Sequence, residues 1–184
     1  MAPSFSTPMK LLSLSMLLIS IIMVYEGNGE LPPSVPSGAT NLVFYLYDKA
    51  TGNNATVAAV TGIKGKDWSY HTFGSVFVVD DPIMVGPSEL SDPVGRAQGM
   101  LVVADHDGDN VNVVLSIVFD HLQYKGSTLQ LQGIARQHEN IREVSVVSGT
   151  GKFRFARGYA LFQTEHYDPL TSHSIIQLRI TVQT

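Results

Sequence analysis

The C-terminal stretch IQLRITVQ, residues 176–183, alternates apolar and polar side chains at every position. Its apolar members lie two residues apart and are Ile176, Leu178, Ile180 and Val182. A period of two is typical of a β-strand that buries one face and exposes the other. The stretch therefore predicts a strand at the end of an all-β domain.

The chain upstream of this strand has the same character back to about residue 41. Short runs rich in β-branched and aromatic residues alternate with turn signals such as Asp107-Gly108-Asp109, and Asp80-Asp81-Pro82 is expected to build a turn of this kind. Regularly spaced short strands are typical of antiparallel barrels and sandwiches. Strands are expected near 41–48, 55–63, 71–79, 97–105, 110–120, 127–134, 143–148, 152–164 and 173–183.

Two of the expected strands are apolar on both faces. They are LVFYLYD, residues 42–48, and the run at residues 110–119. In an antiparallel sheet, two apolar faces indicate that both faces are covered. We therefore expect one face to line a closed interior and the other to meet a second subunit, which favours a barrel in an oligomer over a lone sandwich.

The N-terminus has the layout of a secretory signal peptide. Lys10 precedes an uncharged apolar run at residues 11–25, and Gly27 and Gly29 follow in a small-x-small arrangement. We expect a signal peptide at 1–29, a flexible arm at 30–40 and one domain at 41–184, with an uncleaved anchor as the alternative. A secreted chain makes the sequon at Asn54 a candidate for glycosylation.

Composition excludes several classes of function. The 184 residues carry 12 Lys plus Arg against 16 Asp plus Glu, a net charge of −4, which argues against a nucleic-acid partner. The chain has no Cys, which removes thiolate metal sites and thiol nucleophiles. No metal, cofactor or nucleophile motif is present. Asp48 and Arg142 remain as polar residues facing an apolar interior, where they could give acid–base help to a planar hydrophobic ligand.

Several motifs occur together and in a fixed order over residues 41–183. They are FYLYD (44–48), VDDP (79–82), VGRAQG (94–99), YKGSTL (124–129), VVSGTGKF (146–153) and ARGYA (156–160). On these motifs the chain resembles the plant dirigent family. The resemblance implies an eight-stranded antiparallel β-barrel, a homotrimer, and secretion to the apoplast.

The resemblance also implies phenolic substrates that react through radicals or quinone methides. One branch of the family guides the coupling of monolignol radicals that a laccase or peroxidase produces. Another branch, the pterocarpan synthases, removes water from a 2′-hydroxyisoflavanol and closes a ring without oxidant or cofactor. The radical-coupling branch carries an Asp where this chain has Ala135. It also carries a Tyr just after the RAQG motif, where the residues of this chain start with Met100. These departures favour the pterocarpan branch, whose products include defence compounds.

The resemblance assigns roles to three residues, Asp48, Arg142 and Thr164. In this hypothesis Asp48 protonates the leaving hydroxyl, Arg142 stabilises the developing phenolate, and Thr164 orients the ring. Asp48 could instead be a strand-end residue bonded to a turn amide, and Arg142 a partner of Glu143 or Asp80.

The walls of the pocket are expected to come from apolar side chains, namely Phe44, Leu46, Phe73 and Phe119. No cofactor or metal is expected, and no membrane contact after signal cleavage. A non-catalytic guide for radical coupling and a cell-wall or defence binding module remain as alternative functions.

Overall fold

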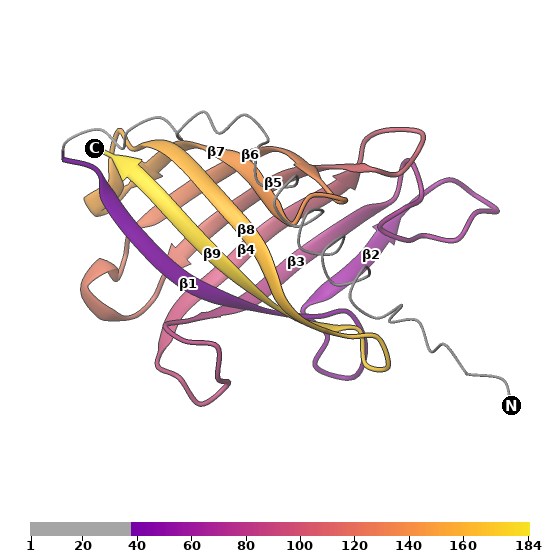
Figure 1. The fold of residues 1–184 in the computed structure, drawn as a ribbon, viewed down its shortest axis with the longest axis horizontal. Coiled ribbons are helices and arrows are strands. Elements are labelled where there is room, and N and C mark those ends of the chain that lie inside the picture. Colours follow the sequence, from indigo (N-terminus) through magenta and orange to yellow (C-terminus); the bar gives the residue numbers. More distant parts are fainter. Residues whose placement is uncertain (1–37) are drawn as a thin grey trace, which may run out of the picture. The chain divides into compact units, whose positions relative to one another are not determined.

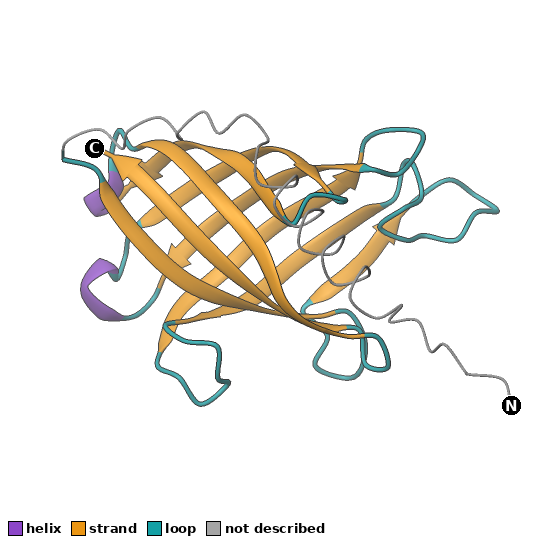
Figure 2. Cartoon of the chain, in the orientation of Figure 1, coloured by secondary structure: helices purple, strands orange, loops and turns teal. Residues whose placement is uncertain are grey.

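The computed structural model describes residues 38–184 as an all-β domain (Figures 1 and 2). Within these residues there is no α-helix, and two single-turn 3-10 helices lie at Leu122–Tyr124 and Gly151–Phe153. The strands are β1 (Thr40–Lys49), β2 (Val57–Thr61), β3 (Val76–Met84), β4 (Pro93–Val103), β5 (Asn110–Phe119), β6 (Thr128–Arg136), β7 (Ile141–Thr150), β8 (Arg157–Asp168) and β9 (His173–Gln183).

Eight of these strands close into an antiparallel barrel, which confirms the predicted fold class. The sheet order is β1-β9-β8-β7-β6-β5-β4-β3-β2, and β1 also pairs with β3. Pairing between β1 and β9 extends over ten residues, whereas β1 and β3 pair only at Tyr45↔Met84 and Leu46↔Ile83. The short β2 continues the sheet beyond β3 (Figure 1). The seam that closes the barrel is therefore narrow, and it ends just before Asp48.

The predicted turn at Asp80-Asp81-Pro82 is wrong, because these three residues lie inside β3. Burial alternates along this strand, and Asp81 takes an inward position between Val79 and Ile83. The backbone N–H of Asp80 donates toward Thr56 on the seam side, and Pro82 faces the same side two residues later. Since pairing with β1 begins only at Ile83, the missing N–H of proline costs no ladder hydrogen bond there.

Two other strands begin later than predicted. The expected strand at 71–79 begins at Val76, and the one expected at 152–164 begins at Arg157. Phe155 has a φ of 67°, a left-handed conformation that interrupts extended chain. The residues before Arg157 instead form a single-turn 3-10 helix followed by a turn.

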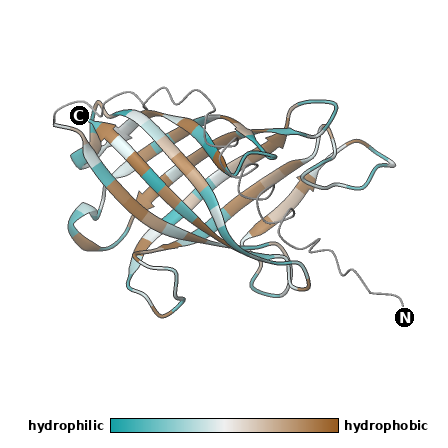
Figure 3. Cartoon of the chain, viewed as in Figure 1, coloured by the Kyte–Doolittle hydropathy of each residue, from teal (hydrophilic) through white to brown (hydrophobic). Residues whose placement is uncertain are grey.

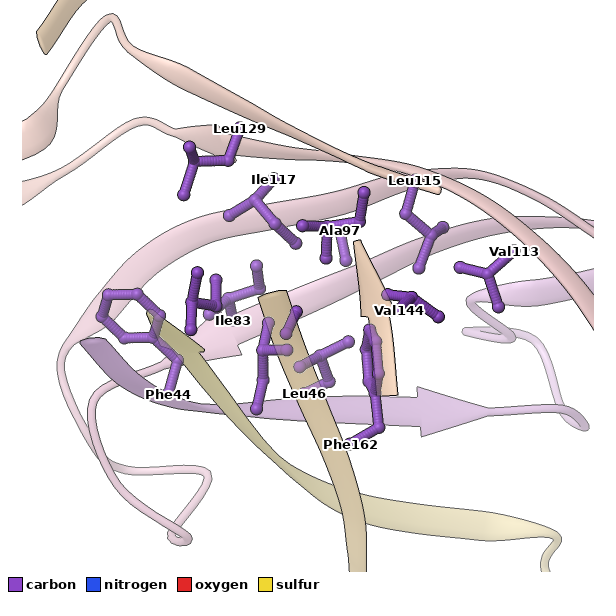
Figure 4. Close-up of a cluster of buried hydrophobic side chains, with 14 of the residues drawn as sticks. Phe44, Leu46, Ile83, Ala97, Val113, Leu115, Ile117, Leu129, Val144 and Phe162 are labelled. Carbon is purple, nitrogen blue, oxygen red and sulfur yellow. The ribbon is translucent and has the colours of Figure 1, made fainter. Parts of the chain in front are cut away.

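The interior is filled by the inward-facing residues of every barrel strand. Figure 3 shows apolar and polar residues alternating along the strands, and Figure 4 shows buried side chains from several strands meeting inside. One end of the barrel is closed by an aromatic cluster of four rings. Phe119 packs against Phe44, Tyr124 and Phe153 with ring centroids 5.9, 5.5 and 5.2 Å apart. We call this group the aromatic plug.

The predicted signal peptide and residues 30–37 of the predicted arm lie outside the described residues. In residues 38–184 no helix has the length and hydropathy needed to cross a bilayer. Asn54 lies exposed between β1 and β2, and its glycosylation stays a prediction.

Candidate functional site

A cavity of about 450 Å³ occupies the end of the barrel opposite the aromatic plug. It is lined by the last residues of β1, β4, β6 and β8 and the first residues of β5, β7 and β9, which meet at one end because the strands are antiparallel, and by the middle of β3. Most of the lining is apolar, and includes Leu46, Val79, Leu101, Val113, Leu115 and Phe162. Asp48, Tyr70, Asp81, Arg142 and Thr164 are among its polar members. A mainly apolar pocket with a few convergent polar groups is the usual form of a small-molecule site.

The structure brings the three predicted reactive residues, Asp48, Arg142 and Thr164, to this one cavity. Leu46 also lines it, but the other predicted wall residues do not. Phe44 shares the inward face of β1 with Asp48 but lies four residues, or about 13 Å, further along the strand. Figure 4 shows Phe44 at the opposite end of the buried cluster from Val113, which lines the cavity.

The two remaining predicted wall residues are also placed elsewhere. Phe119 belongs to the aromatic plug, since β5 enters the cavity at its first residues and ends at the plug. Phe73 lies in the β2–β3 loop, where its ring packs against His106 with centroids 4.1 Å apart. Sharing a face of a strand therefore did not identify the wall, because position along the barrel axis decides which residues reach the cavity.

Arg142 and Thr164 form a pair at the mouth of the cavity. The registry of β7 and β8 places Arg142 opposite Phe162, and Thr164 follows two residues later on the same face. Arg142 Nη2 donates to Thr164 Oγ1 at 2.9 Å. Burial lowers the pKa of Arg142 from its usual value, but guanidinium groups remain charged in proteins. Arg142 makes no ion pair within residues 38–184, so a bound anionic oxygen would meet a cation that Thr164 holds in place.

Asp48 is the one carboxylate of β1 and lies near the end of that strand. Burial raises its pKa to about 6, and the nearby His173 partly opposes this shift. No hydrogen bond from a turn amide to this carboxylate is found among the described residues. Asp48 is therefore free to bind a ligand, and its pKa lies close to neutral pH.

Asp81 is the site residue that the sequence reasoning missed. Its side chain is only 3% exposed and lines the same cavity. Burial raises its pKa to about 8; the charge on Asp48 adds to the effect, and a hydrogen bond with Thr56 opposes it. The alternation of Phe77, Val79 and Ile83 indicates that position 81 faces inward, whereas Pro82 taken alone is a turn signal.

Thr56 links β1, which carries Asp48, to β3, which carries Asp81, beyond the point where these two strands pair directly. Its N–H donates to the carbonyl of Lys49, its carbonyl accepts from Asp80, and its hydroxyl lies 2.5 Å from Asp81 Oδ1. Continuing the registry of Leu46↔Ile83 by two residues puts Asp48 opposite Asp81. The site thus contains two neighbouring carboxyl groups whose pKa values differ, which is the arrangement expected of an acid and a base.

The chemistry that these groups support is proton transfer and stabilisation of negative charge. In the part of the chain that the structure describes, no three His, Cys, Asp or Glu side chains gather as a metal site would require.

Comparison with known proteins places this geometry in a family. The family model of dirigent-like proteins matches residues 39–183. Dirigent protein 23 of Arabidopsis thaliana is 33% identical over 175 residues, which is 92% of this chain and 94% of that protein. Pterocarpan synthase 1 of Glycyrrhiza echinata is 36% identical over 146 residues, which is 78% of this chain and 77% of that protein.

The fold gives the same result as the sequence. The solved structure of a pterocarpan synthase dirigent protein matches with a TM-score of 0.72 and 34% identity, over 78% of this chain and 83% of that one. The barrel, the cavity at one end of it and the match along the whole described domain agree: this chain is a member of the dirigent family.

Proposed function

We propose that the protein removes water from a 2′-hydroxyisoflavanol and closes a ring to give a pterocarpan, without oxidant or cofactor. The observation that carries this proposal is that Asp48, Asp81, Arg142 and Thr164 line one mainly apolar cavity. Pterocarpan synthase 1 from Glycyrrhiza echinata and from Glycine max, at 36% and 33% identity, supports the same reaction class.

The first step needs an acid at the leaving hydroxyl. Of the two carboxyl groups, Asp81 has the higher pKa and carries the proton at neutral pH. We therefore assign the acid to Asp81 and not to Asp48. Asp81 gives its proton to the hydroxyl on C4, the C4–O bond breaks, and water leaves.

Loss of water leaves a positive centre that the phenol of the fused ring neutralises. The phenol gives up its proton to solvent at the cavity mouth and becomes the carbonyl of a quinone methide. Arg142, held by Thr164, favours loss of this proton and stabilises the phenolate that ring closure forms on the same oxygen. Arg142 and the two carboxyl groups therefore act on opposite ends of the substrate.

Ring closure uses the second carboxyl group. The 2′-hydroxyl attacks C4 and gives its proton to the Asp48 carboxylate, while the phenolic oxygen regains a proton from solvent. The proton then passes from Asp48 to Asp81, because Asp81 has the higher pKa. The net reaction is the loss of one water, and both carboxyl groups return to their starting states. Binding in one pose makes the closure stereoselective.

We further propose that the protein is a secreted homotrimer. Val78, Met100 and Val114 form a row by registry across the outer face of β3, β4 and β5, and all three are about 40% exposed or more. An apolar row of this kind on the outside of a barrel supports contact with another copy. Light scattering of the purified protein tests this, and a monomer would contradict it.

The test of the reaction is turnover of a 2′-hydroxyisoflavanol by purified protein with no oxidant present. Formation of a pterocarpan at a rate above that in buffer supports the proposal. A requirement for laccase or peroxidase would instead favour guidance of radical coupling.

A further inference from the structure

Tyr70, in the loop between β2 and β3, has a buried hydroxyl that no residue in the described domain satisfies. Burying a hydroxyl without a partner destabilises a protein, and buried polar groups in native structures nearly always have partners. The other group of this kind among residues 38–184 is Ser75, which does not line the cavity. Tyr70 is one of the residues that line the cavity, and a molecule bound there is a source of the missing acceptor.

Tyr70 is held in place by one contact to its ring and one to its backbone. It stacks on Phe77 with centroids 4.3 Å apart and an interplanar angle of 19°. The side-chain amide of Gln137 donates to the carbonyl of Tyr70 and, at 2.8 Å, to the carbonyl of Gly108. One glutamine thus ties together the loops between β2 and β3, β4 and β5, and β6 and β7. A donor fixed in this way costs little entropy when a ligand binds.

Close packing of the loops strengthens this arrangement. Gly108 has a φ of 77°, and a Cβ atom there would lie 2.2 Å from the carbonyl oxygen of His71, next to Tyr70. The glycine therefore allows two loops to touch. Tyr70 also borders a second cavity of about 390 Å³, lined by Trp68 and Tyr167 among others, so this residue borders both spaces.

The surroundings of the hydroxyl define what it can bind. Burial and the charges of Asp48 and Asp81 all raise the pKa of Tyr70, so the phenol stays protonated and acts as a donor. In the proposed reaction Asp81 protonates the leaving hydroxyl on C4, and Asp48 takes the proton of the 2′-hydroxyl that attacks the same carbon. The donor and the proposed acid line the same cavity and lie close enough for the charge of Asp81 to act on Tyr70.

We propose that the hydroxyl of Tyr70 donates a hydrogen bond to the C4 oxygen of the substrate, the oxygen that leaves as water. This inference rests on the proposed function. Tyr70 transfers no proton: it binds and polarises the oxygen, and Asp81 supplies the proton that completes the water. Tyr70 is then a catalytic residue, and Gln137 is a positioning residue that acts through it.

The experiment uses two ligands that differ only in that oxygen. One is 2′-hydroxyisoflavanol, and the other is the corresponding 2′-hydroxyisoflavan, which lacks the hydroxyl on C4. Calorimetry measures the binding of each ligand to the parent protein and to Tyr70→Phe. If the parent protein converts the isoflavanol to product, both proteins also carry Asp81→Asn, so that the ligand stays intact. Loss of one hydrogen bond predicts about tenfold weaker binding of the isoflavanol and less than twofold change for the isoflavan.

Thermal unfolding and two further variants complete the test. Tyr70→Phe removes an unpaired buried group, so its melting temperature should equal or exceed that of the parent. Tyr124→Phe, the same substitution in the aromatic plug, should leave both affinities unchanged. Gln137→Leu should reduce the preference for the isoflavanol as Tyr70→Phe does.

The outcomes separate this inference from the proposed function. Equal effects of Tyr70→Phe on both ligands, or no effect on either, overturn the role of Tyr70. A selective loss of isoflavanol binding in a protein that forms no pterocarpan supports the contact and overturns only the reaction. Failure of both ligands to bind the parent protein overturns both.

Discussion

Asp80 and Asp81 are adjacent in the sequence, yet their side chains lie on opposite faces of β3. Asp80 faces outward, pairs with Arg96 and accepts a hydrogen bond from Gln98 at 3.0 Å. These contacts, above all the hydrogen bond from Arg96, hold the pKa of Asp80 below its usual value, whereas burial raises that of Asp81 to about 8. One carboxyl group is therefore a surface anion, and its neighbour carries a proton inside the cavity.

This pair provides a matched test of the proposed acid. Asp81→Asn removes the proton donor but keeps the size and hydrogen-bonding capacity of the side chain. We expect a fall in kcat of about 10²–10⁴-fold, the usual contribution of a general acid. Asp80→Asn, one residue away, should keep kcat within a fewfold of the parent. Equal losses in steady-state assays of the two variants would show that the cavity carboxyl has no special role.

The rate should depend on pH through both cavity carboxyl groups. Asp48 must be ionised and Asp81 protonated, so kcat/KM should rise through about pH 6 and fall through about pH 8. Because the two groups interact, these values describe the pair and not each residue alone. The profile is measured with the parent, with Asp48→Asn, which should lose the acidic limb, and with Asp81→Asn, which should lose the basic limb. A flat profile in the parent contradicts the acid–base assignment.

Stability should depend on pH in the opposite sense to that of most proteins with salt-bridged carboxylates. Asp81 has an ordinary value of 3.8 and a folded value of about 8, so between these pH values the folded state holds a proton that the unfolded state has lost. The free energy of unfolding therefore falls as pH rises through this window, by about 1.4 kcal/mol for each pKa unit of difference. Urea unfolding at several pH values measures this. Asp81→Asn should be more stable than the parent at pH 8, and a steeper decline in the variant would refute the assignment.

Arg142 and Thr164 should contribute unequally to the reaction. Arg142→Met removes the charge that stabilises the phenolic oxygen, for which we expect a loss of about 10²–10³-fold in kcat. Thr164→Val keeps the shape of the side chain but removes the hydroxyl that accepts a hydrogen bond from Arg142. We expect a smaller loss in kcat, of about tenfold. Steady-state kinetics distinguish the two. A larger loss for Thr164→Val than for Arg142→Met would mean that the hydroxyl, and not the cation, contacts the substrate.

The aromatic plug should matter for stability and not for binding. Phe119 is 1% exposed and contacts three other rings, so Phe119→Ala should lower the free energy of unfolding by about 3–5 kcal/mol. Ligand affinity of the folded variant should stay within about twofold, because Phe119 does not line the cavity. Denaturant titration and calorimetry make the two measurements. A selective loss of ligand affinity would place Phe119 in the wall after all.

Much of the fold was predictable from the sequence, because strand periodicity is a local signal. The alternation of Ile176, Leu178 and Ile180 identified β9, and the two apolar faces of residues 42–48 indicated closure into a barrel. The family motifs then supplied the number of strands. The error at Asp80-Asp81-Pro82 arose because proline is a turn signal in isolation, while the narrow seam that tolerates it is a tertiary feature.

The site was predictable only in part. Asp48, Arg142 and Thr164 do meet in one cavity, and the motifs that contain Asp48 and Arg142 are visible in the sequence. Phe44 and Phe119 do not line this cavity, because both belong to the aromatic plug. Where the plug forms decides how far the cavity extends into the barrel. The buried hydroxyl of Tyr70 belongs to a loop without periodicity, so nothing local in the sequence marks it.

The most direct test of the central claim is an incubation of purified protein with racemic 2′-hydroxyisoflavanol, with no oxidase and no added cofactor. Products are separated by chiral chromatography, with Asp81→Asn and buffer alone as controls. We predict that one pterocarpan enantiomer forms much faster than in buffer, and that the variant loses this acceleration. Racemic product at the rate seen in buffer alone would contradict the claim that this cavity catalyses the dehydration.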